Sequence, residues 1–530
     1  MSTPSAVFQN ESYADFSQPG NRSAMRDALA AVRAEFGREY ELLIAGARLK
    51  TEGKLRSLNP SRPGEVVGIH QKGTALEAGQ AVEAASAYFP EWSRTRPERR
   101  AELLFNAAQI MRRRKLEFDA WMVFEAGKTW PEAEADTCEA IDFCDYYARQ
   151  MLRFASPPEL VQLPGERDRM VYLPLGAGVV IAPWNFPVAI LVGMTTAALV
   201  AGNTVVIKPS SDTPTVAARF VEVLLEAGFP ERSLTLLTGS GAAVGDVLVE
   251  HRLTRFVSFT GSREVGLRIN ELAARPRPGQ IWIKRVIAEM GGKDAIIVDD
   301  EADLDAAVQG VLVSAYGYQG QKCSACSRAI VSEKVYDEFL SRLASKVAAI
   351  KVGPADDPDN YMGPVINERA RQSILEYIEV GKREGRLVAG GGPAPGPEGT
   401  PEGGPEDAPG FFVQPTVIAD VGPKARIFQE EIFGPVLAVT KARDFDHALD
   451  LANDSEYGLT GAVYTTNRRK IDKACDRFFV GNLYINRKCT GAMVGAHPFG
   501  GFNMSGTDSK AGGPDYLLQF LQTKSIGERL

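Results

Sequence analysis

The hydrophobic positions follow two different patterns along the chain, and the change falls near residue 172. Residues 20–45 and 75–155 are rich in Ala, Arg and Glu, with charged positions opposite apolar ones, which predicts helices. After residue 172, short apolar runs alternate with helical patterns. The runs predicted as strands are 178–182, 204–207, 234–238 and 255–260. This alternation is typical of βαβ units that build a parallel sheet.

A second alternating region begins near residue 294. It contains predicted strands at 294–298 and 329–332, and predicted helices at 304–318 and 335–349. We therefore expect a second α/β domain. Residues 390–410 consist largely of Gly, Pro and Glu, a composition that predicts a surface loop without a packed core.

Length and charge narrow the class of protein. A chain of 530 residues is long enough for about three domains. Its net charge of -7 and the lack of a dense Lys/Arg run argue against a nucleic-acid partner. The start of the chain has no apolar core of a signal peptide. The uncharged stretch 170–207 is broken by Pro and Asn, and its apolar part, 188–201, is too short to cross a bilayer. We expect a cytoplasmic protein with no membrane partner.

The cysteines are too sparse for a disulfide scaffold. They are Cys138, Cys144, Cys323, Cys326, Cys475 and Cys489. Cys323 and Cys326 form a Cys-x-x-Cys pair, which leaves a redox or metal-binding role open. No second pair exists to complete a metal site, and the four histidines are scattered, so we expect no metal.

Cys323 is the strongest candidate for chemistry. A thiol nucleophile needs a base to activate it or its attacking water, and Glu289 is a carboxylate that could serve from a neighbouring strand or loop. Asn185 follows a predicted strand within Pro-Trp-Asn-Phe-Pro, where its side-chain amide could donate a hydrogen bond to a developing oxyanion. A purely structural Asn in a turn bounded by prolines is the alternative.

Two further segments suit a dinucleotide. Lys208 ends a predicted strand, the position where α/β sheets bind ligands, although a solvated loop Lys is the alternative. Gly261 and Ser262 lead from a strand into a helix, whose N-terminus suits a pyrophosphate. A competing glycine set at 239–245 matches a dinucleotide fingerprint only weakly, and we interpret it as a turn with some cofactor contact.

Together, these segments resemble the catalytic and binding signatures of the NAD(P)-dependent aldehyde dehydrogenase superfamily over nearly the whole chain after residue 40. The resemblance implies that Cys323 is the nucleophile, Glu289 the general base and Asn185 the oxyanion donor. It implies NAD as the cofactor. The implied cofactor-binding residues are Ile181, Pro183, Trp184, Lys208, Ser211, Gly261, Ser262, Glu431 and Phe433.

The region 486–517 resembles more closely the 1-pyrroline-5-carboxylate dehydrogenases, which oxidise L-glutamate γ-semialdehyde in proline catabolism. That substrate carries a carboxylate, an ammonium and an aldehyde. The resemblance implies that the carboxylate is held by Lys322, Ser324 and the backbone at Gly491 and Ala492. It implies that Glu139 meets the ammonium and that Phe186 and Phe499 clamp the aliphatic chain. Glu139 as a helix-surface carboxylate and Phe499 as a core aromatic are the alternatives. We also expect Lys322 to help lower the pKa of Cys323.

Three positions depart from the family pattern. His497 stands where Gln is expected, Asp508 where Gly is expected, and Ser211 where NAD-strict relatives often carry Glu. Without a carboxylate to repel a 2′-phosphate at position 211, use of NADP is left open beside NAD.

The expected fold is α/β and aldehyde dehydrogenase-like, with a Rossmann-like NAD-binding domain, an α/β catalytic domain and a small β oligomerisation flap. The predicted divisions are a helical arm at 1–40, the NAD-binding domain at 41–155 and 174–288, the catalytic domain at 289–485, and the flap and C-terminal arm at 156–173 and 486–530. The family pattern implies a homodimer or larger homo-oligomer, with Leu517 and Phe520 buried in a partner, and a functional link to proline dehydrogenase.

The predicted function is oxidation of L-glutamate γ-semialdehyde to L-glutamate through a cysteine thioester. Another semialdehyde dehydrogenase, for example for succinic semialdehyde, is the alternative within the same class. A catalytically silent NAD-binding protein and a cofactor-free thioesterase are the alternatives from other classes.

Overall fold

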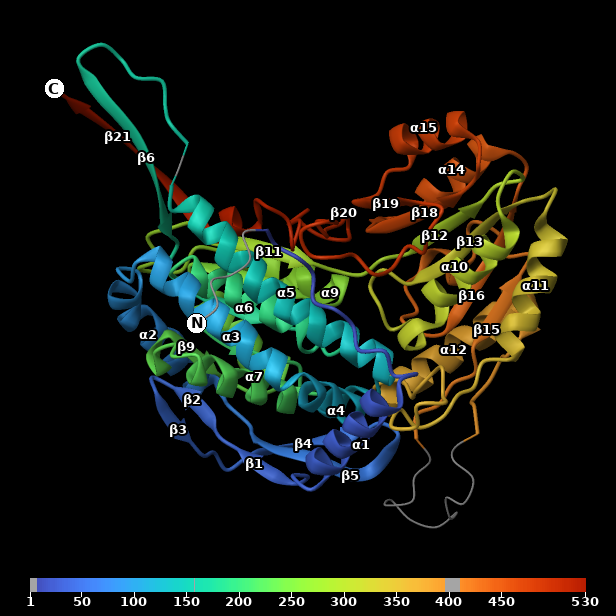
Figure 1. Cartoon of the computed structure of the whole chain (residues 1–530), viewed down its shortest axis with the longest axis horizontal. Helices are drawn as coiled ribbons and strands as arrows, with labels where there is room; N and C mark the ends of the chain where they lie inside the picture. Colours follow the sequence, from blue (N-terminus) through green and yellow to red (C-terminus); the bar gives the residue numbers. More distant parts are fainter. Residues whose placement is uncertain (1–6, 157, 396–409) are drawn as a thin grey trace.

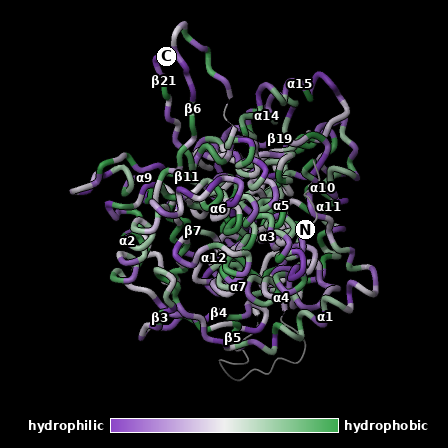
Figure 2. The backbone as a smooth tube through the Cα atoms, turned by 60° about the vertical axis from the view of Figure 1, so that its left-hand side comes forward, coloured by the Kyte–Doolittle hydropathy of each residue, from purple (hydrophilic) through white to green (hydrophobic). Residues whose placement is uncertain are grey.

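The computed structural model describes residues 7–156, 158–395 and 410–530. Two seven-stranded sheets form the body, each covered by helices, and a two-stranded ribbon projects from it (Figure 1). Figure 2 shows hydrophobic segments gathered at the centre of the molecule, around α6 and α5. The α/β class predicted from the sequence is confirmed.

The first sheet has the strand order β11-β10-β7-β8-β9-β2-β3. Its strands are β2 (Leu42–Ile44), β3 (Ala47–Leu49), β7 (Ala177–Ile181), β8 (Thr204–Lys208), β9 (Leu234–Leu236), β10 (Phe256–Thr260) and β11 (Arg285–Glu289). The five strands from β11 to β9 run parallel, and β2 and β3 close one edge as an antiparallel pair. The carboxyl ends of β7, β8 and β10 therefore meet at one edge of the sheet.

The second sheet has the order β14-β15-β16-β13-β12-β18-β19. Its strands are β12 (Asp294–Val298), β13 (Cys326–Ser332), β14 (Arg386–Ala389), β15 (Thr416–Ala419), β16 (Val436–Ala442), β18 (Thr460–Tyr464) and β19 (Asn482–Ile485). The predicted division between residues 288 and 289 falls just before the last residue of β11 in the first sheet, and β12 of the second sheet begins five residues later.

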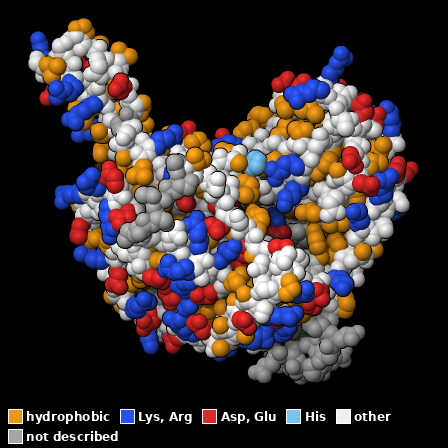
Figure 3. Space-filling model, viewed as in Figure 1, with side chains coloured by type: hydrophobic (Ala, Val, Ile, Leu, Met, Phe, Trp, Pro, Cys, Tyr) orange, Lys and Arg blue, Asp and Glu red, His pale blue; other side chains and the backbone are white. Residues whose placement is uncertain are grey.

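Smaller sheets complete the architecture. Strands β1 (Arg38–Tyr40), β4 (Lys54–Asn59) and β5 (Arg62–Gln71) form one, and β17 (Tyr457–Gly458) pairs with β20 (Phe502–Asn503). The ribbon pairs β6 (Glu166–Pro174) antiparallel with β21 (Leu521–Arg529). Figure 3 shows that it stands clear of the body and carries both hydrophobic and charged side chains.

Fifteen α-helices lie within the described residues. They are α1 (Pro19–Arg33), α2 (Ala75–Trp92), α3 (Pro97–Arg113), α4 (Lys115–Ala126), α5 (Trp130–Phe154), α6 (Ala189–Val200), α7 (Pro214–Glu226), α8 (Asp246–Glu250), α9 (Arg263–Ala274), α10 (Leu304–Tyr316), α11 (Tyr336–Ala348), α12 (Glu368–Glu384), α13 (Arg426–Gln429), α14 (Phe445–Asn453) and α15 (Arg468–Arg477). Thr74 caps α2 and forms a reciprocal capping box with Glu77. The helices predicted at 304–318 and 335–349 and the strands predicted after residue 172 are confirmed, with ends shifted by a few residues.

The helix predicted over 20–45 is wrong in its second half. It ends at Arg33, Gly37 adopts a φ of 77°, and β1 then pairs in parallel with β5. The backbone hydrogen bonds of this pairing outweigh the local helical preference. The stretch 390–410 lies mostly outside the described residues.

Two expectations concern buried surface. Residues 170–207 divide into strands and the 12-residue helix α6, and no helix among the described residues is long and apolar enough to cross a membrane. Leu517 and Phe520 are fully buried in their own chain, and Phe520 packs its ring edge-on against Phe256 at 5.5 Å. Their predicted burial in a partner is therefore wrong, because the chain leaves the body only at β21.

Candidate active site

A cavity of about 860 Å³ opens at the carboxyl ends of β7, β8 and β10 and reaches the loop that carries Cys323. It is lined by every predicted cofactor-binding residue and by two of the three predicted catalytic ones. These are Ile181, Pro183, Trp184, Asn185, Lys208, Ser211, Gly261, Ser262, Cys323, Glu431 and Phe433. The fold thus brings together residues from both sheets in the place where open α/β sheets bind ligands.

Cys323 lies in the loop before β13, surrounded by acidic groups. Burial, and then the carboxyls of Asp294, Glu431 and Glu289, raise the pKa of its thiol well above the usual value. The predicted lowering by Lys322 is wrong, because that ammonium pairs with Glu132 at 2.7 Å. A thiol with a raised pKa would need a base to take its proton before it could act as a nucleophile.

Asn185 lies directly beside the nucleophile loop. Its buried side-chain Nδ2 donates to the backbone oxygen of Gln321, two residues before Cys323, at 3.1 Å. An amide nitrogen has two protons, so one remains for an oxygen bound at the thiol. This geometry fits the predicted oxyanion donor.

Glu289 ends β11 and is held by a segment from the far end of the chain. Its Oε1 accepts from the hydroxyl of Ser509 at 2.6 Å, and its buried Oε2 has no partner in the described part of the chain. Burial outweighs the hydrogen bonds from Ser509 and raises the pKa of Glu289 to about 7. A carboxylate with one free oxygen and such a pKa suits a general base at neutral pH.

The cofactor side of the cavity contains a buried ammonium, that of Lys208. Among the described residues it donates only to the neighbouring Pro209 carbonyl, at 3.1 Å, and desolvation lowers its pKa to about 8. Ser262 caps α9, accepting from Val265 N–H at 3.4 Å, so the first turn of this helix faces the cavity. A buried donor and a helix N-terminus suit a ligand that brings hydroxyls and phosphates. The cavity therefore fits a dinucleotide.

The second sheet contributes Glu431 and Phe433 to the same wall. Glu431 accepts from the backbone N–H of Gly292 at 3.0 Å, and a Cβ on Gly291 would lie 2.1 Å from its carboxylate. Glycine at 291 therefore allows this approach. Phe433 has a φ of 58° and packs edge-on against Trp184 at 5.4 Å.

The predicted substrate side contains a group of buried charges around α5. Burial, and then the nearby carboxyl of Asp136, raise the pKa of Glu139 to about 8. Lys128 and Asp136 are both fully buried and pair at 3.2 Å. The ammonium of Lys128 also lies 3.9 Å from the centre of the Phe186 ring. Glu139 is thus no exposed helix-surface carboxylate, and Phe186 rests on a buried cation.

The segment 490–492, the anchor loop, whose backbone is predicted to hold the carboxylate, presents free backbone donors. Gly491 has a φ of 75°, and Arg487 donates to its carbonyl at 2.9 Å. Within the described residues, the N–H groups of Gly491 and Ala492 have no acceptor in the chain. They are therefore free to bind a carboxylate. Ser324 is buried nearby, and its carbonyl accepts from Cys489 Sγ at 3.3 Å.

Phe499 is half buried and pairs its backbone with Ala511. Two of the three departures from the family pattern have a structural account. His497 bridges the anchor loop, with Nε2 3.2 Å from Arg487 and Nδ1 accepting from Met493 N–H. Asp508 adopts a φ of 52°, the backbone conformation for which Gly is expected.

Sequence reasoning missed the residues that support the site. Ser509 donates a hydrogen bond to Glu289, Lys128 and Asp136 support Phe186, and Glu132 binds Lys322. No spacing or composition marks them. The only available signal was the run of carboxylates along residues 132–145, which falls on a helix with buried neighbours.

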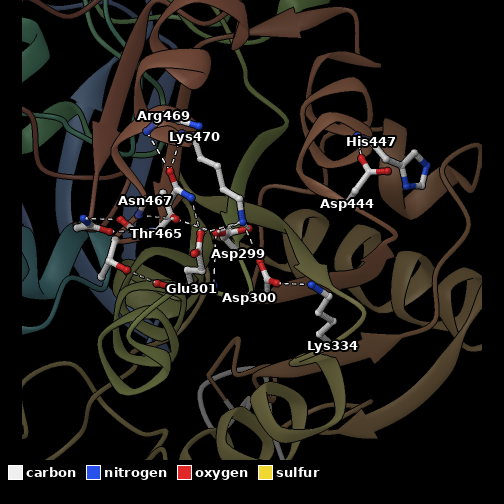
Figure 4. Close-up of polar contacts among 12 residues, drawn as sticks. Asp299, Asp300, Glu301, Lys334, Asp444, His447, Thr465, Asn467, Arg469 and Lys470 are labelled. Carbon is white, nitrogen blue, oxygen red and sulfur yellow. Dashed lines mark hydrogen bonds and ion pairs between the residues drawn. The ribbon is translucent and has the colours of Figure 1, made fainter.

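One acidic group among the described residues is close enough to share a cation. Asp299, Asp300 and Glu301 converge, but Lys470 Nζ lies 2.8, 2.8 and 3.1 Å from their carboxylates (Figure 4). The ammonium already neutralises this group, which lies outside the residues lining the cavity. The absence of a metal stays a prediction.

The similarity to known proteins covers most of the chain, not only the residues of the site. The sequence model of the aldehyde dehydrogenase family matches residues 48–526. A 1-pyrroline-5-carboxylate dehydrogenase from Geobacillus thermodenitrificans is 58% identical over 521 residues, covering 98% of this chain and 99% of that protein. The crystal structure of 1-pyrroline-5-carboxylate dehydrogenase from Thermus with bound NAD is 50% identical, covers both chains fully and superposes with a TM-score of 0.96.

A larger protein contains the same unit. The structure of proline utilization A from Bdellovibrio bacteriovorus is 43% identical with a TM-score of 0.95, and the match covers all of this chain but 54% of that one. The family match spans most of the sequence and agrees with the arrangement of the cavity. This chain belongs to the aldehyde dehydrogenase family.

Proposed function

We propose that this protein oxidises L-glutamate γ-semialdehyde, the open-chain form of 1-pyrroline-5-carboxylate, to L-glutamate in proline breakdown. One observation carries the proposal: Cys323 lies in the cavity, and its chain neighbour Lys322 lies close enough to act on the half-buried carboxyl of Glu139, in a region that also offers free backbone donors. The names and coverage of the relatives support the same reaction.

The cofactor is NAD, held by Lys208, Ser211, the first turn of α9, Glu431 and Phe433. When bound, NAD accepts the hydride that the oxidation releases. Ser211 places a hydroxyl, which donates to Gly239 oxygen at 3.3 Å, where a carboxylate would exclude a 2′-phosphate. Use of NADP therefore stays open.

In the first half of the reaction, Cys323 Sγ attacks the aldehyde carbon. Because the pKa of the thiol is raised, its proton must leave, and the free Oε2 of Glu289 is the available acceptor. Asn185 Nδ2 and the Cys323 backbone N–H stabilise the resulting oxyanion. One such donor is typically worth about 3 kcal/mol.

In the second half, Cys323 is acylated as a thioester. Glu289 takes a proton from a water molecule, whose oxygen attacks the thioester carbon. The Cys323 sulfur leaves as thiolate and regains a proton, and L-glutamate is released. The proton that Glu289 takes from the thiol passes to solvent before the second half begins, so the same carboxylate can act twice, which fits a pKa of about 7.

The α-carboxylate binds the N–H groups of Gly491 and Ala492, with Ser324 and Lys322 nearby, and the ammonium meets Glu139. Phe186 and Phe499 enclose the aliphatic chain. Lys322 keeps Glu132 as its partner, so the backbone donors make the direct contacts.

The assembly we infer is a homodimer or larger homo-oligomer in which the β6–β21 ribbon docks on a second copy. The ribbon stands apart from the body, and Leu163 and Leu173 remain exposed on it. A functional link to a proline dehydrogenase is supported by the match to part of proline utilization A. A cytoplasmic location stays a prediction.

NADH formation with 1-pyrroline-5-carboxylate, measured beside succinic semialdehyde and acetaldehyde, tests the proposal. Strong selectivity for the first supports it. Equal rates would keep the family and reject the substrate. No turnover with any aldehyde, together with an unreactive Cys323 in thiol titration, would favour the catalytically silent alternative.

A further inference from the structure

The first described residues lie against the substrate side of the molecule. Residues 8–14, the N-terminal strap, run along α5 at the dark-blue end of the chain (Figure 1). None of these residues carries a recognised motif. Their contacts nevertheless join two elements that are far apart in the sequence, the helix with Glu139 and the anchor loop with Gly491 and Ala492.

Asn10 bridges these two elements directly. Its Nδ2 donates to Asp142 Oδ2 on α5 at 2.8 Å and to the backbone oxygen of Val494, just after the anchor loop, at 3.0 Å. Asp142 lies three residues after Glu139, so both side chains project from neighbouring positions on the helix surface. One amide group therefore sets the separation between the predicted ammonium site and the predicted carboxylate site.

The backbone of the strap is anchored to α5 at two places. Glu11 N–H donates to Asp142 Oδ1 at 2.7 Å, and Ala14 N–H donates to Glu134 Oε1 at 2.6 Å. Lys115 Nζ also binds Glu134, at 2.5 Å. These charge-assisted hydrogen bonds hold the strap in register along one face of the helix.

Aromatic residues of the strap reach the residues just after the anchor loop. Phe8 packs edge-on against Tyr146 of α5 at 5.0 Å, and a Cβ on Gly495 would lie 3.2 Å from its ring. Tyr13 donates its hydroxyl to Met493 Sδ at 3.5 Å. Burial, and then the Glu139 carboxyl, raise the pKa of Tyr13 to about 12.

We propose that the N-terminal strap is a positioning element for amino-acid recognition, with Asn10 and Tyr13 holding the anchor loop at a fixed distance from Glu139. The inference rests on the proposed function, which it deepens. The ammonium and carboxylate of an α-amino acid sit on one carbon atom. Their two receptors must therefore keep one separation, and a shift of about 1 Å is costly.

Loosening the strap should affect only substrates that carry an amino-acid end. An aldehyde that lacks the amino-acid end uses Cys323, Asn185 and Glu289 but neither receptor. Loosening the strap should therefore raise KM for the amino-acid aldehyde and leave simple aldehydes unaffected.

The test compares Asn10→Ala with Asn21→Ala. Asn21 is a matched control, because its amide also donates to a backbone oxygen, that of Asp15 at 2.9 Å, but bridges nothing to the anchor loop. We expect Asn10→Ala to raise KM for 1-pyrroline-5-carboxylate about tenfold, with kcat changing less. KM for acetaldehyde, and both constants in Asn21→Ala, should stay within about twofold.

A second measurement is independent of turnover. Direct titration of the full-length protein with L-glutamate and with butyrate reports binding with and without the amino-acid end. Asn10→Ala and Tyr13→Phe should weaken L-glutamate binding, the first about tenfold, and leave butyrate unchanged.

The possible results separate the two proposals. If the wild-type protein binds L-glutamate but does not oxidise 1-pyrroline-5-carboxylate, the proposed function is rejected. The role of the strap is then decided by L-glutamate binding alone. Unchanged L-glutamate binding in Asn10→Ala would overturn the inference. Parallel losses with acetaldehyde, together with a lower Tm, would show a general stabilising role and overturn it as well.

Discussion

The cofactor side and the substrate side of the cleft use charge in different ways. On the cofactor side, strand ends and the first turn of α9 present backbone groups, and the buried Lys208 has no ion pair within the part of the chain that the structure describes. On the substrate side, Lys128 pairs with Asp136 and Lys322 pairs with Glu132 before any ligand arrives.

The difference shows how each side obtains its specificity. A dinucleotide brings its own charges and hydroxyls, so unpaired donors of the protein are completed by the ligand. A small amino-acid aldehyde must be distinguished from other aldehydes by position. Buried ion pairs add little net stability, but they hold their members in one place. The charges of the substrate side therefore work mainly as supports for Phe186 and the anchor loop.

Cys323 serves both sides, so its replacement should have the largest effect. We expect Cys323→Ala to lower kcat at least about 1,000-fold, because no other group can form the thioester. NAD binding should persist, since the cofactor contacts remain. Cys475→Ala is the control, because Cys475 is exposed and outside the cavity. Retained turnover in Cys323→Ala would disprove the assignment.

The ionisation of Glu289 should make the activity depend on pH. Its pKa of about 7 predicts that activity falls as pH drops through 7, because the carboxylate becomes protonated and can no longer accept a proton. Glu289→Gln should lower kcat about 100-fold and remove this acidic limb. Ser509→Ala should move the limb to higher pH, because the hydrogen bonds from Ser509 favour the ionised form. A limb that stays in place in Ser509→Ala would show that another group titrates.

Lys128 tests whether the substrate side depends on its buried pair. Lys128→Met leaves Asp136 buried without its cation, which should reduce the free energy of unfolding by about 3 kcal/mol. Adding Asp136→Asn keeps the acceptor for Ala189 N–H and should restore part of that loss. Urea unfolding measures the stability, and KM for 1-pyrroline-5-carboxylate reports on Phe186. An additive loss in the double variant would contradict the pairing.

The smallest effects should separate the two sides cleanly. Lys208→Ala should raise KM for NAD about tenfold and leave KM for the aldehyde unchanged, whereas Glu139→Gln should do the reverse. Steady-state kinetics with each substrate varied in turn measures both. If the two variants changed the same constant, the cleft would not divide as described.

Much of the fold was predictable because its signals are local. The buried strands β7, β8, β10 and β12 read as short apolar runs, and the helices between residues 75 and 155 as amphipathic patterns. The sheet edge at residues 38–44 was not predictable, because β1 is stabilised by pairing with β5 rather than by its own residues.

The residues of the site likewise fall into those that a local sequence pattern marks and those that it does not. The predicted cofactor residues follow strand ends in order along the chain, so motif and position coincide. The predicted substrate residues come from α5, the loop at Cys323 and the C-terminal region, and nothing local marks the residues that support them. The expected lowering of the thiol pKa by Lys322 failed for this reason: adjacency in sequence to Cys323 left open whether the ammonium was already bound, and Glu132 binds it.

The sequence by itself determined the α/β class and the order of the motifs along the chain, and it predicted the nucleophile and its base, because these depend on residue type and short-range pattern. Only the tertiary structure decided the ionisation of Cys323 and Glu289, the burial of Leu517 and Phe520 within their own chain, and the bridge made by Asn10. Those properties depend on neighbours brought together by folding: Asn10 and Val494 are 484 residues apart and share one hydrogen bond.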